Sequence, residues 1–191
     1  MNKVITAAAG HPDISIIVSV YNEEESLGLF FETIRKTMER ADGYTYEIIC
    51  IDDGSTDGTY NLLEQYATED FRVKVLKFSR NFGKEAAMYA GLQASDGDFA
   101  VIMDADLQHP PQLVAEMIRI VEETGCDSCA ARRVSRKGEP KIRSALARAF
   151  YKLMNRYSDI EIVDGAVDFR LMNRKMVKAI VGMPENQRFS K

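Results

Sequence analysis

Two patterns of apolar and polar positions alternate along the chain. Continuous apolar runs of strand length begin with Ile14 to Val20, and the runs end at polar turns. Further strand-like runs occupy residues 46–52, 73–78 and 99–105, and two more lie around residues 128–133 and 167–172. Between the runs, apolar residues recur at helical spacing, as do Leu27, Phe31, Ile34 and Met38. Continuous apolar runs are typical of strands buried on both faces, whereas the spaced residues indicate amphipathic helices.

Capping residues and prolines mark where the helices are expected to begin. Asn22, followed three residues later by Glu25, is similar to a capping box and predicts a helix start. Asp57 can cap the next helix, and residues 83–95 predict a helix of small side chains that packs closely on a sheet. Pro110 and Pro111 open a further helix, because proline is tolerated in the first turn.

The alternation of strands and helices predicts an α/β fold. Its central sheet should be mostly parallel, with right-handed crossovers between strands. A chain of 191 residues with 46% hydrophobic residues has the size and apolar content of one domain. Residues 1–191 are therefore expected to form a single domain, with residues 1–12 flexible.

Acidic residues follow two of the predicted strands at the carboxyl edge of the sheet. Asp104, Asp106 and Gln108 alternate, so an extended backbone would point all three side chains to one side. Oxygen ligands of this kind suit Mg²⁺ or Mn²⁺, with phosphate oxygens and water completing the coordination shell. Asp52 and Asp53 follow another strand and can hydrogen-bond a base or ribose, as acids do in nucleotide-binding folds. The alternative is a helix cap and a turn that bind nothing.

Other nucleotide and metal sites lack their signatures in this sequence. No G-x-G-x-x-G follows a strand, which disfavours a dinucleotide site, and a P-loop is also absent. The three cysteines, Cys50, Cys126 and Cys129, are too few for a disulfide scaffold. A lone C-x-x-C without a second pair of ligands disfavours zinc, so we expect reduced cysteines.

Positive charge is concentrated in one segment of a chain whose net charge is −4. Residues 132–157 contain nine Lys or Arg and one acid, and from residue 140 the basic side chains follow a helical stripe beside an apolar face. This pattern predicts either an interfacial helix on an anionic membrane or a packed helix with a solvated basic face. The basic residues that we assign to this surface are Arg132, Arg133, Lys141, Arg148, Lys152 and Arg156. Without a signal peptide or an apolar run of roughly 18 residues, the sequence predicts a soluble or peripheral protein.

Five motifs follow one another along the chain: "SVYNEEE", "DDGSTDGT", "NFGKEAA", "MDADLQHPP" and "DFRLMNR". In this order and spacing they resemble the inverting GT-A glycosyltransferases of family 2. Within that family the chain looks like the polyprenyl-phosphate branch, which contains dolichol-phosphate mannosyltransferases and undecaprenyl-phosphate glycosyltransferases. The resemblance runs from about Ile14 to Lys191 and implies a GT-A, Rossmann-like three-layer sandwich. The family usually has proline where this chain has Ser19. Its members commonly continue into membrane-spanning helices, so we expect a chain truncated at its C-terminus.

The resemblance also implies roles for individual residues. The implied donor-binding residues are Tyr21, Glu23, Asp52, Asp53, Lys84, Asp104, Arg188 and Lys191. Asp104, Asp106 and Gln108 would bind the metal, and Asp168 and Arg170 would form the catalytic pair at the reacting centre. Asp168 would act as base if the acceptor is a hydroxyl. If the acceptor is a phosphate already ionised at neutral pH, Asp168 would orient Arg170 or the metal shell, and a purely structural partnership with Arg170 is the further alternative.

The implied function is transfer of a hexose, with inversion, from a nucleotide sugar to a polyprenyl phosphate. A UDP-sugar is the favoured donor, GDP-mannose is the second choice, and Mg²⁺ or Mn²⁺ is the expected cofactor. The alternatives are a family 2 transferase acting on a saccharide hydroxyl and a nucleotide-sugar-binding domain without turnover. We expect an anionic membrane surface as a further partner, no nucleic acid, and location at the cytoplasmic face of the membrane, with a homo-oligomer left open.

Overall fold

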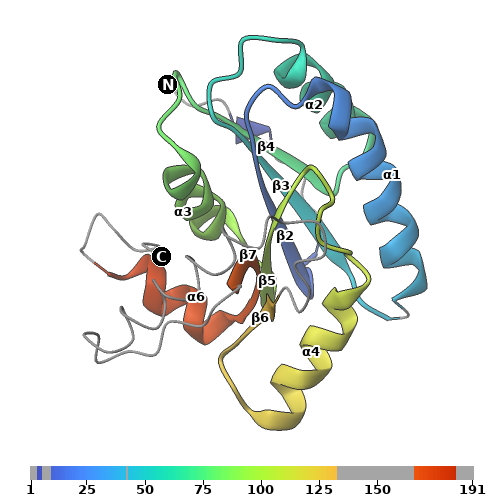
Figure 1. Ribbon diagram of the computed structural model, residues 1–191, viewed down its shortest axis with the longest axis vertical. Helices are drawn as coiled ribbons and strands as arrows, with labels where there is room; N and C mark the ends of the chain where they lie inside the picture. Colours follow the sequence, from blue (N-terminus) through green and yellow to red (C-terminus); the bar gives the residue numbers. More distant parts are fainter. Residues whose placement is uncertain (1–3, 6–9, 42, 133–165, 184–191) are drawn as a thin grey trace, which may run out of the picture. The chain divides into compact units, whose positions relative to one another are not determined.

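The computed structural model describes residues 4–5, 10–41, 43–132 and 166–183 (Figure 1). The chain divides into two units, one made of residues 1–129 and 169–191, the other of residues 130–168. The pocket and the helices described below belong to the first unit. The predictions of a single domain and of a flexible N-terminal segment stay predictions.

A seven-stranded sheet has the strand order β1-β4-β3-β2-β5-β7-β6. The strands are β1 (Val4–Ile5), β2 (Ile14–Val20), β3 (Tyr46–Asp52), β4 (Val73–Lys77), β5 (Phe99–Asp104), β6 (Ser128–Arg132) and β7 (Ala166–Asn173). The neighbours β4, β3, β2 and β5 are parallel, whereas β1 is antiparallel to β4 and β7 is antiparallel to β5. The mostly parallel sheet is confirmed. The segment around residues 167–172 forms the antiparallel strand β7, whose direction the apolar run did not indicate.

Helices cover both faces of the sheet in three layers, which confirms the expected sandwich. They are α1 (Glu24–Arg40), α2 (Thr59–Glu69), α3 (Lys84–Ala94), α4 (Leu113–Thr124) and α6 (Arg174–Val181). Figure 1 shows α3 and α6 on one side of the sheet and α1, α2 and α4 on the other. The side-chain amide of Gln112, just before α4, donates to the hydroxyl of Thr37 in α1 at 3.3 Å. This contact joins α1 to the start of α4.

Helix α3 packs unusually closely on the sheet because of a glycine. A Cβ atom added to Gly91 would lie 2.3 Å from Cγ2 of Ile17 in β2 and 2.9 Å from Cδ1 of Ile51 in β3. The helix therefore contacts β2 and β3 directly, and Ala87 and Leu92 join the same buried cluster. The small side chains that the sequence places in this helix serve the predicted close packing.

The predicted capping box at the start of α1 is wrong. The helix begins at Glu24, and its N-cap residue, Glu23, makes no side-chain capping hydrogen bond. Asn22 has a left-handed backbone with φ 55°, and its side-chain oxygen accepts instead from the backbone N–H of Thr56 at 2.9 Å. A partner from a distant loop thus replaces the local cap.

The other two predicted helix starts lie close to the observed ones. A carboxylate oxygen of Asp57 accepts from the backbone N–H of Thr59, the first residue of α2, at 3.0 Å. Pro110 and Pro111 form a turn immediately before α4, and their carbonyls accept from the first residues of the helix at 3.0–3.1 Å. The helix itself begins at Leu113.

The described helices are short. The longest of them, α1, has 17 residues, and none in the described part of the chain has both the length and the apolar character to cross a membrane. The basic helix predicted from residue 140 onward lies outside the described residues.

Candidate functional site at the carboxyl edge of the sheet

Three parallel strands bring the two acidic segments to one edge of the sheet. β2 lies between β3 and β5. Val20 of β2 pairs in register with Asp52 of β3, and Ser19 pairs with Asp104 of β5. The residues that follow these strands therefore meet at the carboxyl edge, where open α/β sheets bind their ligands.

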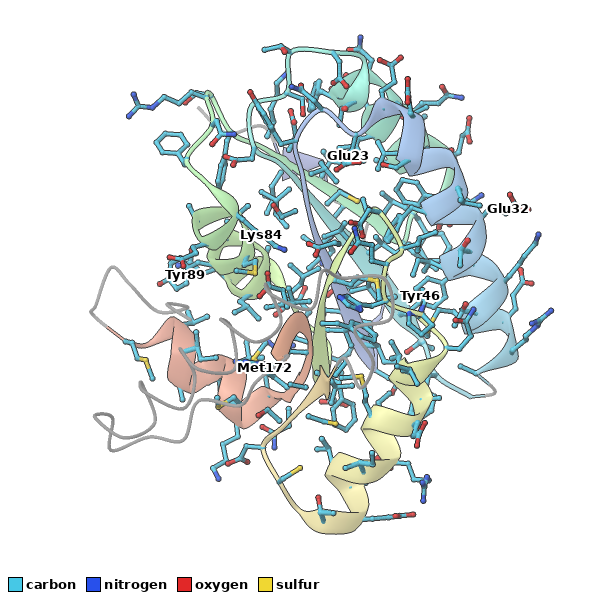
Figure 2. The ribbon with its side chains drawn as sticks, in the orientation of Figure 1. Glu23, Glu32, Tyr46, Lys84, Tyr89 and Met172 are labelled. Carbon is cyan, nitrogen blue, oxygen red and sulfur yellow. The ribbon has the colours of Figure 1, made fainter. Side chains whose placement is uncertain are left out.

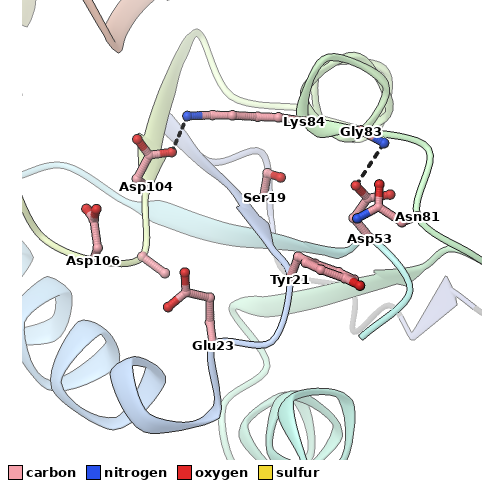
Figure 3. Close-up of a pocket in the computed structure, with 10 residues that line it drawn as sticks. Ser19, Tyr21, Glu23, Asp53, Asn81, Gly83, Lys84, Asp104 and Asp106 are labelled. Carbon is pink, nitrogen blue, oxygen red and sulfur yellow. Dashed lines mark hydrogen bonds and ion pairs between the residues drawn. The ribbon is translucent and has the colours of Figure 1, made fainter. Parts of the chain in front are cut away.

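A pocket of about 390 Å³ opens at this edge (Figure 3). Its volume falls within the range of roughly 300–1,000 Å³ that is typical of small-molecule sites. The lining residues are Ser19, Tyr21, Glu23, Asp53, Asn81, Gly83, Lys84, Asp104, Ala105 and Asp106. Four of these side chains are acids and one is a lysine, so the pocket carries a net negative charge.

Asp104 and Asp106 form one side of the pocket. Asp104 is the last residue of β5, and its Oδ1 lies 2.5 Å from the ammonium of Lys84, the first residue of α3. Asp106 is exposed and follows in the turn after β5. Figure 2 shows Lys84 on α3 among the side chains of the described residues. Figure 3 shows the lysine side chain reaching across to Asp104, with Asp106 on the same side of the pocket.

The backbone after Asp104 is not extended. The prediction that Asp104, Asp106 and Gln108 all point to one side required an extended backbone, so the structure does not support it. The chain turns directly after β5, and Leu107 adopts a left-handed φ of 55°. The N–H of Gln108 turns back and donates to Oδ1 of Asp106 at 3.1 Å. The side chain of Gln108 is exposed, and this residue is not among those lining the pocket.

The two carboxylates fit a divalent cation that arrives with other ligands. Within the described residues, no group of three or more His, Cys, Asp or Glu side chains is arranged to hold a metal by itself. Mg²⁺ is commonly bound by one or two carboxylates, with substrate phosphates and water supplying the remaining oxygens. Asp104 and Asp106 match this donor set, because they are hard oxygen ligands at the mouth of an open pocket.

Asp53 fixes a neighbouring segment from the opposite side of the pocket. Its side chain is 3% exposed, and its two oxygens accept from the backbone N–H groups of Phe82 at 2.7 Å and Gly83 at 2.9 Å. A carboxylate bonded to backbone N–H groups makes charge-assisted hydrogen bonds, which are stronger than neutral ones. Asp53 therefore holds the segment that leads into α3.

Asp52 lies beneath the pocket rather than in its lining. The side chain is fully buried, and Oδ1 accepts from the backbone N–H of Ser55 at 2.9 Å. The second oxygen, Oδ2, is buried without a hydrogen-bond partner among the described residues. Of the two neighbouring acids, Asp53 is thus the one that a ligand in the pocket can approach.

Tyr21 and Glu23 reach the pocket from the loop after β2. Tyr21 is 46% exposed, which leaves a ring surface open to a ligand. Glu23 is held on both sides: its backbone N–H donates to Oγ1 of Thr59 at 2.8 Å, and its carboxylate accepts from the hydroxyl of Ser26 at 2.5 Å. Both residues line the pocket, and the donor-binding role that the resemblance implies for them stays a prediction.

The loop after β2 and the loop after β3 are joined by side-chain to backbone hydrogen bonds. In addition to the bond between Asn22 and Thr56, the N–H of Asn22 donates to the hydroxyl of Ser55 at 3.0 Å. The N–H of Gly58 donates to the carboxylate of Glu24 at 2.9 Å. These hydrogen bonds join the loop that carries Tyr21 and Glu23 to the loop that follows Asp53.

The strand that carries "DFRL" contacts the acidic loop through a ring pair. The rings of Phe169 and His109 are parallel, with centroids 6.0 Å apart. Arg170 pairs in register with Ile102 of β5, is half-buried, and does not line the pocket. Asp168 is half-buried and belongs to the other unit of the chain. The catalytic roles of Asp168 and Arg170 stay predictions.

The remaining predicted residues cannot be placed in the site. Arg188 and Lys191 lie outside the described residues, as does the side chain of Arg132. The same holds for the other basic residues assigned to the membrane surface, Arg133, Lys141, Arg148, Lys152 and Arg156.

Sequence reasoning missed Asn81 and did not assign a role to Ser19. Asn81 lies in the "NFGKEAA" motif, and Ser19 is the residue opposite Asp104 in the sheet. The available signal for Asn81 was the glycine of the "DDG" turn. Gly54 has a φ of 77°, and a Cβ atom there would lie 2.5 Å from the carbonyl carbon of Arg80. The turn after β3 therefore lies directly against the backbone that presents Asn81.

The three cysteines are free thiols in the structure. Cys50 is fully buried in β3, and burial raises the pKa of its thiol to about 12. Burial is also the main reason why the pKa of Cys129 is raised. A raised pKa lowers the thiolate fraction at neutral pH, and neither cysteine is among the residues that line the pocket.

Comparison with known proteins gives a family match over most of the chain. The model of the family described as "Glycosyl transferase family 2" matches residues 15–181. The protein CsbB of Bacillus subtilis, whose name describes it as a glycosyltransferase, is 43% identical over 93% of this chain and 53% of its own length. A bactoprenol glucosyl transferase of Shigella phage SfX is 39% identical over 93% of this chain and 58% of its own. The chain spans little more than half the length of these relatives.

Solved structures share the fold at low sequence identity. A mannosyltransferase from Pyrobaculum calidifontis, solved with GDP-mannose and Mn²⁺, superposes with a TM-score of 0.61 at 20% identity. The match covers 91% of this chain and 48% of that protein. This similarity supports the GT-A assignment of the fold.

Proposed function

Because the chain belongs to glycosyl transferase family 2, we propose that it moves a hexose from a nucleotide sugar to a polyprenyl phosphate, with inversion at the anomeric carbon. A UDP-sugar is the first donor to test, and GDP-mannose is the second. The observation that carries the proposal is the acid-rich pocket at the carboxyl edge of the sheet.

The charge of the pocket supports a donor that binds together with a cation. Glu23, Asp53, Asp104 and Asp106 surround the cavity, and Lys84 is the one basic side chain among its lining residues. A nucleoside diphosphate is itself an anion, so these carboxylates repel it unless a cation lies between the two. Asp104 and Asp106 supply the ligands for that cation, and the diphosphate supplies further oxygens.

Loss of the nucleotide creates negative charge on the leaving diphosphate. A bound Mg²⁺ or Mn²⁺ would stabilise this charge as a Lewis acid. Lys84 lies beside Asp104, so its ammonium can donate a charge-assisted hydrogen bond to a phosphate oxygen at the same end of the pocket. Asp53 holds the segment that leads to Lys84 and keeps the lysine at that end.

A lipid phosphate is the acceptor that the relatives support. One relative is named a bactoprenol glucosyl transferase, and bactoprenol is a polyprenyl lipid. The second pKa of a phosphate monoester is about 6, so such an acceptor is mostly a dianion at neutral pH and attacks without losing a proton. Under this proposal Asp168 orients Arg170 rather than acting as a base.

A transfer assay tests the proposal directly. Protein, UDP-glucose, Mn²⁺ and a polyprenyl phosphate should yield UDP and a lipid-linked hexose, and chelation of the metal should stop both. Transfer to a saccharide in place of the lipid would favour the hydroxyl-acceptor alternative. Donor binding without any metal-dependent release of UDP would favour the binding domain without turnover. A thermal-shift panel of UDP-, GDP- and dTDP-sugars would identify the base.

We further propose that the basic residues between positions 141 and 156 dock the protein on an anionic membrane surface. Each Lys or Arg near such a surface contributes about 1 kcal/mol. Replacing Lys141, Arg148, Lys152 and Arg156 with Gln should therefore weaken binding to anionic vesicles by up to about a thousandfold. Flotation with anionic and neutral vesicles measures this. Equal binding of the wild type and the fourfold variant to anionic vesicles would contradict the proposal, whereas donor binding should be unchanged.

A further inference from the structure

The pocket has two chemically different ends. Figure 3 shows Asp104 and Asp106 on one side, and Asp53 with Asn81 on the other. Tyr21 lies between the two ends, nearer to Asp53, with part of its ring exposed. Under the proposed function, a cation and a diphosphate belong at the end with Asp104 and Asp106. The nucleoside of the same ligand then extends toward Asp53 and Asn81.

The backbone that carries Asn81 is held in place by the turn after β3. We call this arrangement the clamp: Asp53 and Gly54 on one side and residues 80–83 on the other. Gly54 approaches so closely that a Cβ atom would lie 2.7 Å from the backbone nitrogen of Asn81. Both oxygens of Asp53 accept from the two N–H groups that follow. Asn81 is therefore presented to the pocket by a fixed backbone, although its side chain is exposed.

Asn81 adds a hydrogen-bond donor to an end of the pocket where Asp53 can only accept. Each oxygen of Asp53 already accepts one backbone N–H, which leaves each of them one further lone pair. The amide of Asn81 carries two N–H donors and a carbonyl acceptor. A uracil edge presents an N–H between two carbonyl oxygens, so it needs an acceptor and a donor side by side. Asp53 and Asn81 together supply both.

We propose that Asn81 hydrogen-bonds the base of the bound nucleotide and contributes to the choice of base. This inference rests on the proposed function, since it requires a nucleotide in the pocket. The test must therefore separate contacts with the base from contacts with the diphosphate. UDP and inorganic pyrophosphate serve as the two probes, because only UDP carries a nucleoside. GDP has the same ribose with another base, so a contact with the base should make Asn81→Ala weaken UDP binding more than GDP binding.

The experiment is calorimetric titration, with Mn²⁺ present, of the wild type, Asn81→Ala, Asn81→Asp and Asn61→Ala. Asn61 is an exposed asparagine of α2 outside the pocket, so its variant is the matched control. Asn81→Ala should weaken UDP binding about three- to tenfold, the range for a single hydrogen bond, and leave pyrophosphate binding unchanged. Asn81→Asp should weaken UDP binding at least as much, because it removes both donors and adds a charge. Asn61→Ala should match the wild type with both probes.

The outcomes distinguish this inference from the proposed function. Unchanged UDP affinity in both Asn81 variants would overturn the role of Asn81 alone. Equal weakening of UDP and pyrophosphate binding by Asn81→Ala would also overturn it, because the residue would then act on the diphosphate. A wild type that binds neither probe would overturn the proposed function, and this inference with it. Equal thermal stability of the wild type and Asn81→Ala shows that the variant is folded.

Discussion

Replacing Asp53 with Asn is the sharpest test of how the site is built, because it changes two hydrogen bonds and almost no volume. The carboxylate is 3% exposed and accepts from the N–H groups of Phe82 at 2.7 Å and Gly83 at 2.9 Å. Asparagine keeps one acceptor oxygen but turns the other atom into an N–H₂ group that faces a backbone N–H. One of the two N–H groups then loses its partner.

The expected loss can be worked out from these contacts. A hydrogen bond to a charged group contributes about 1.5–3 kcal/mol, and an unpaired buried N–H costs about 1–3 kcal/mol. Part of this loss in stability is offset, because the neutral asparagine avoids the cost of burying the carboxylate charge. We expect a net loss of about 2 kcal/mol in the free energy of unfolding, which lowers Tm by roughly 4–8 °C for a chain of this size. The released segment also carries Asn81 and Lys84, so Mn²⁺-dependent UDP affinity should fall.

Urea denaturation and calorimetric UDP titration measure the two effects on the same protein. Asp57→Asn is the matched control, because that carboxylate also accepts a backbone N–H, from Thr59 at 3.0 Å, but lies outside the pocket. The control should keep its UDP affinity and lose less stability. If Asp53→Asn were as stable as the wild type and bound UDP equally well, Asp53 would not be holding the segment, and the clamp would be refuted.

Three further predictions address the cation end and the fold. Asp106→Ala should abolish Mn²⁺-dependent UDP binding and Asp104→Ala should weaken it strongly; unchanged affinity in both variants would refute the metal assignment. Lys84→Met should strengthen binding of Mn²⁺ alone about fivefold, because it removes a repulsion of about 1 kcal/mol between the lysine ammonium and the cation. Electron paramagnetic resonance of free Mn²⁺ measures this binding, and equal or weaker binding by the variant would contradict the prediction. Hydrogen bonds from the Arg72 guanidinium hold the pKa of Asp70 below its usual 3.8. The pair therefore stabilises the fold above that pH, and the stabilisation is lost as pH falls through the lowered pKa. Asp70→Asn should lower Tm at pH 7 and lower it less at about pH 2, and an equal effect at both values would refute this.

Much of the fold could be predicted because buried parallel strands leave a strong signal. The runs at residues 14–20 and 46–52 match β2 and β3 residue for residue, since both are dominated by large apolar side chains and are followed by polar turns. The direction of β7 could not be predicted, because direction depends on the path by which the chain returns to the sheet. The capping box at Asn22 failed for a related reason: its side chain bonds Thr56, more than thirty residues away, in place of the local cap.

The candidate site was predictable in part for the same reason. Asp104 ends β5 and Asp53 directly follows β3, so their position at one edge follows from the alternation of strands and helices. The clamp was not predictable, because it joins the turn after β3 to a segment about thirty residues later. Gly54 was the visible sign, since a positive φ and a close backbone approach both require glycine. The sequence at Gly54 alone, however, does not identify which segment of the backbone lies against it.

The charge of the pocket has a thermodynamic consequence for how its ligands bind. The carboxylates of the lining repel a diphosphate, and a free cation near Asp104 meets the ammonium of Lys84. The cation would therefore reduce the repulsion between the carboxylates and the diphosphate, and the diphosphate would reduce the repulsion between Lys84 and the cation. Because such coupling is reciprocal, Mn²⁺ must raise the affinity for the nucleotide by the same factor by which the nucleotide raises the affinity for Mn²⁺. When the cation and the diphosphate are present together, Lys84 can turn from Asp104 to a phosphate oxygen without leaving a carboxylate uncompensated. Under the proposed function, such an acid-rich pocket would bind an anionic nucleotide selectively in its metal-bound form.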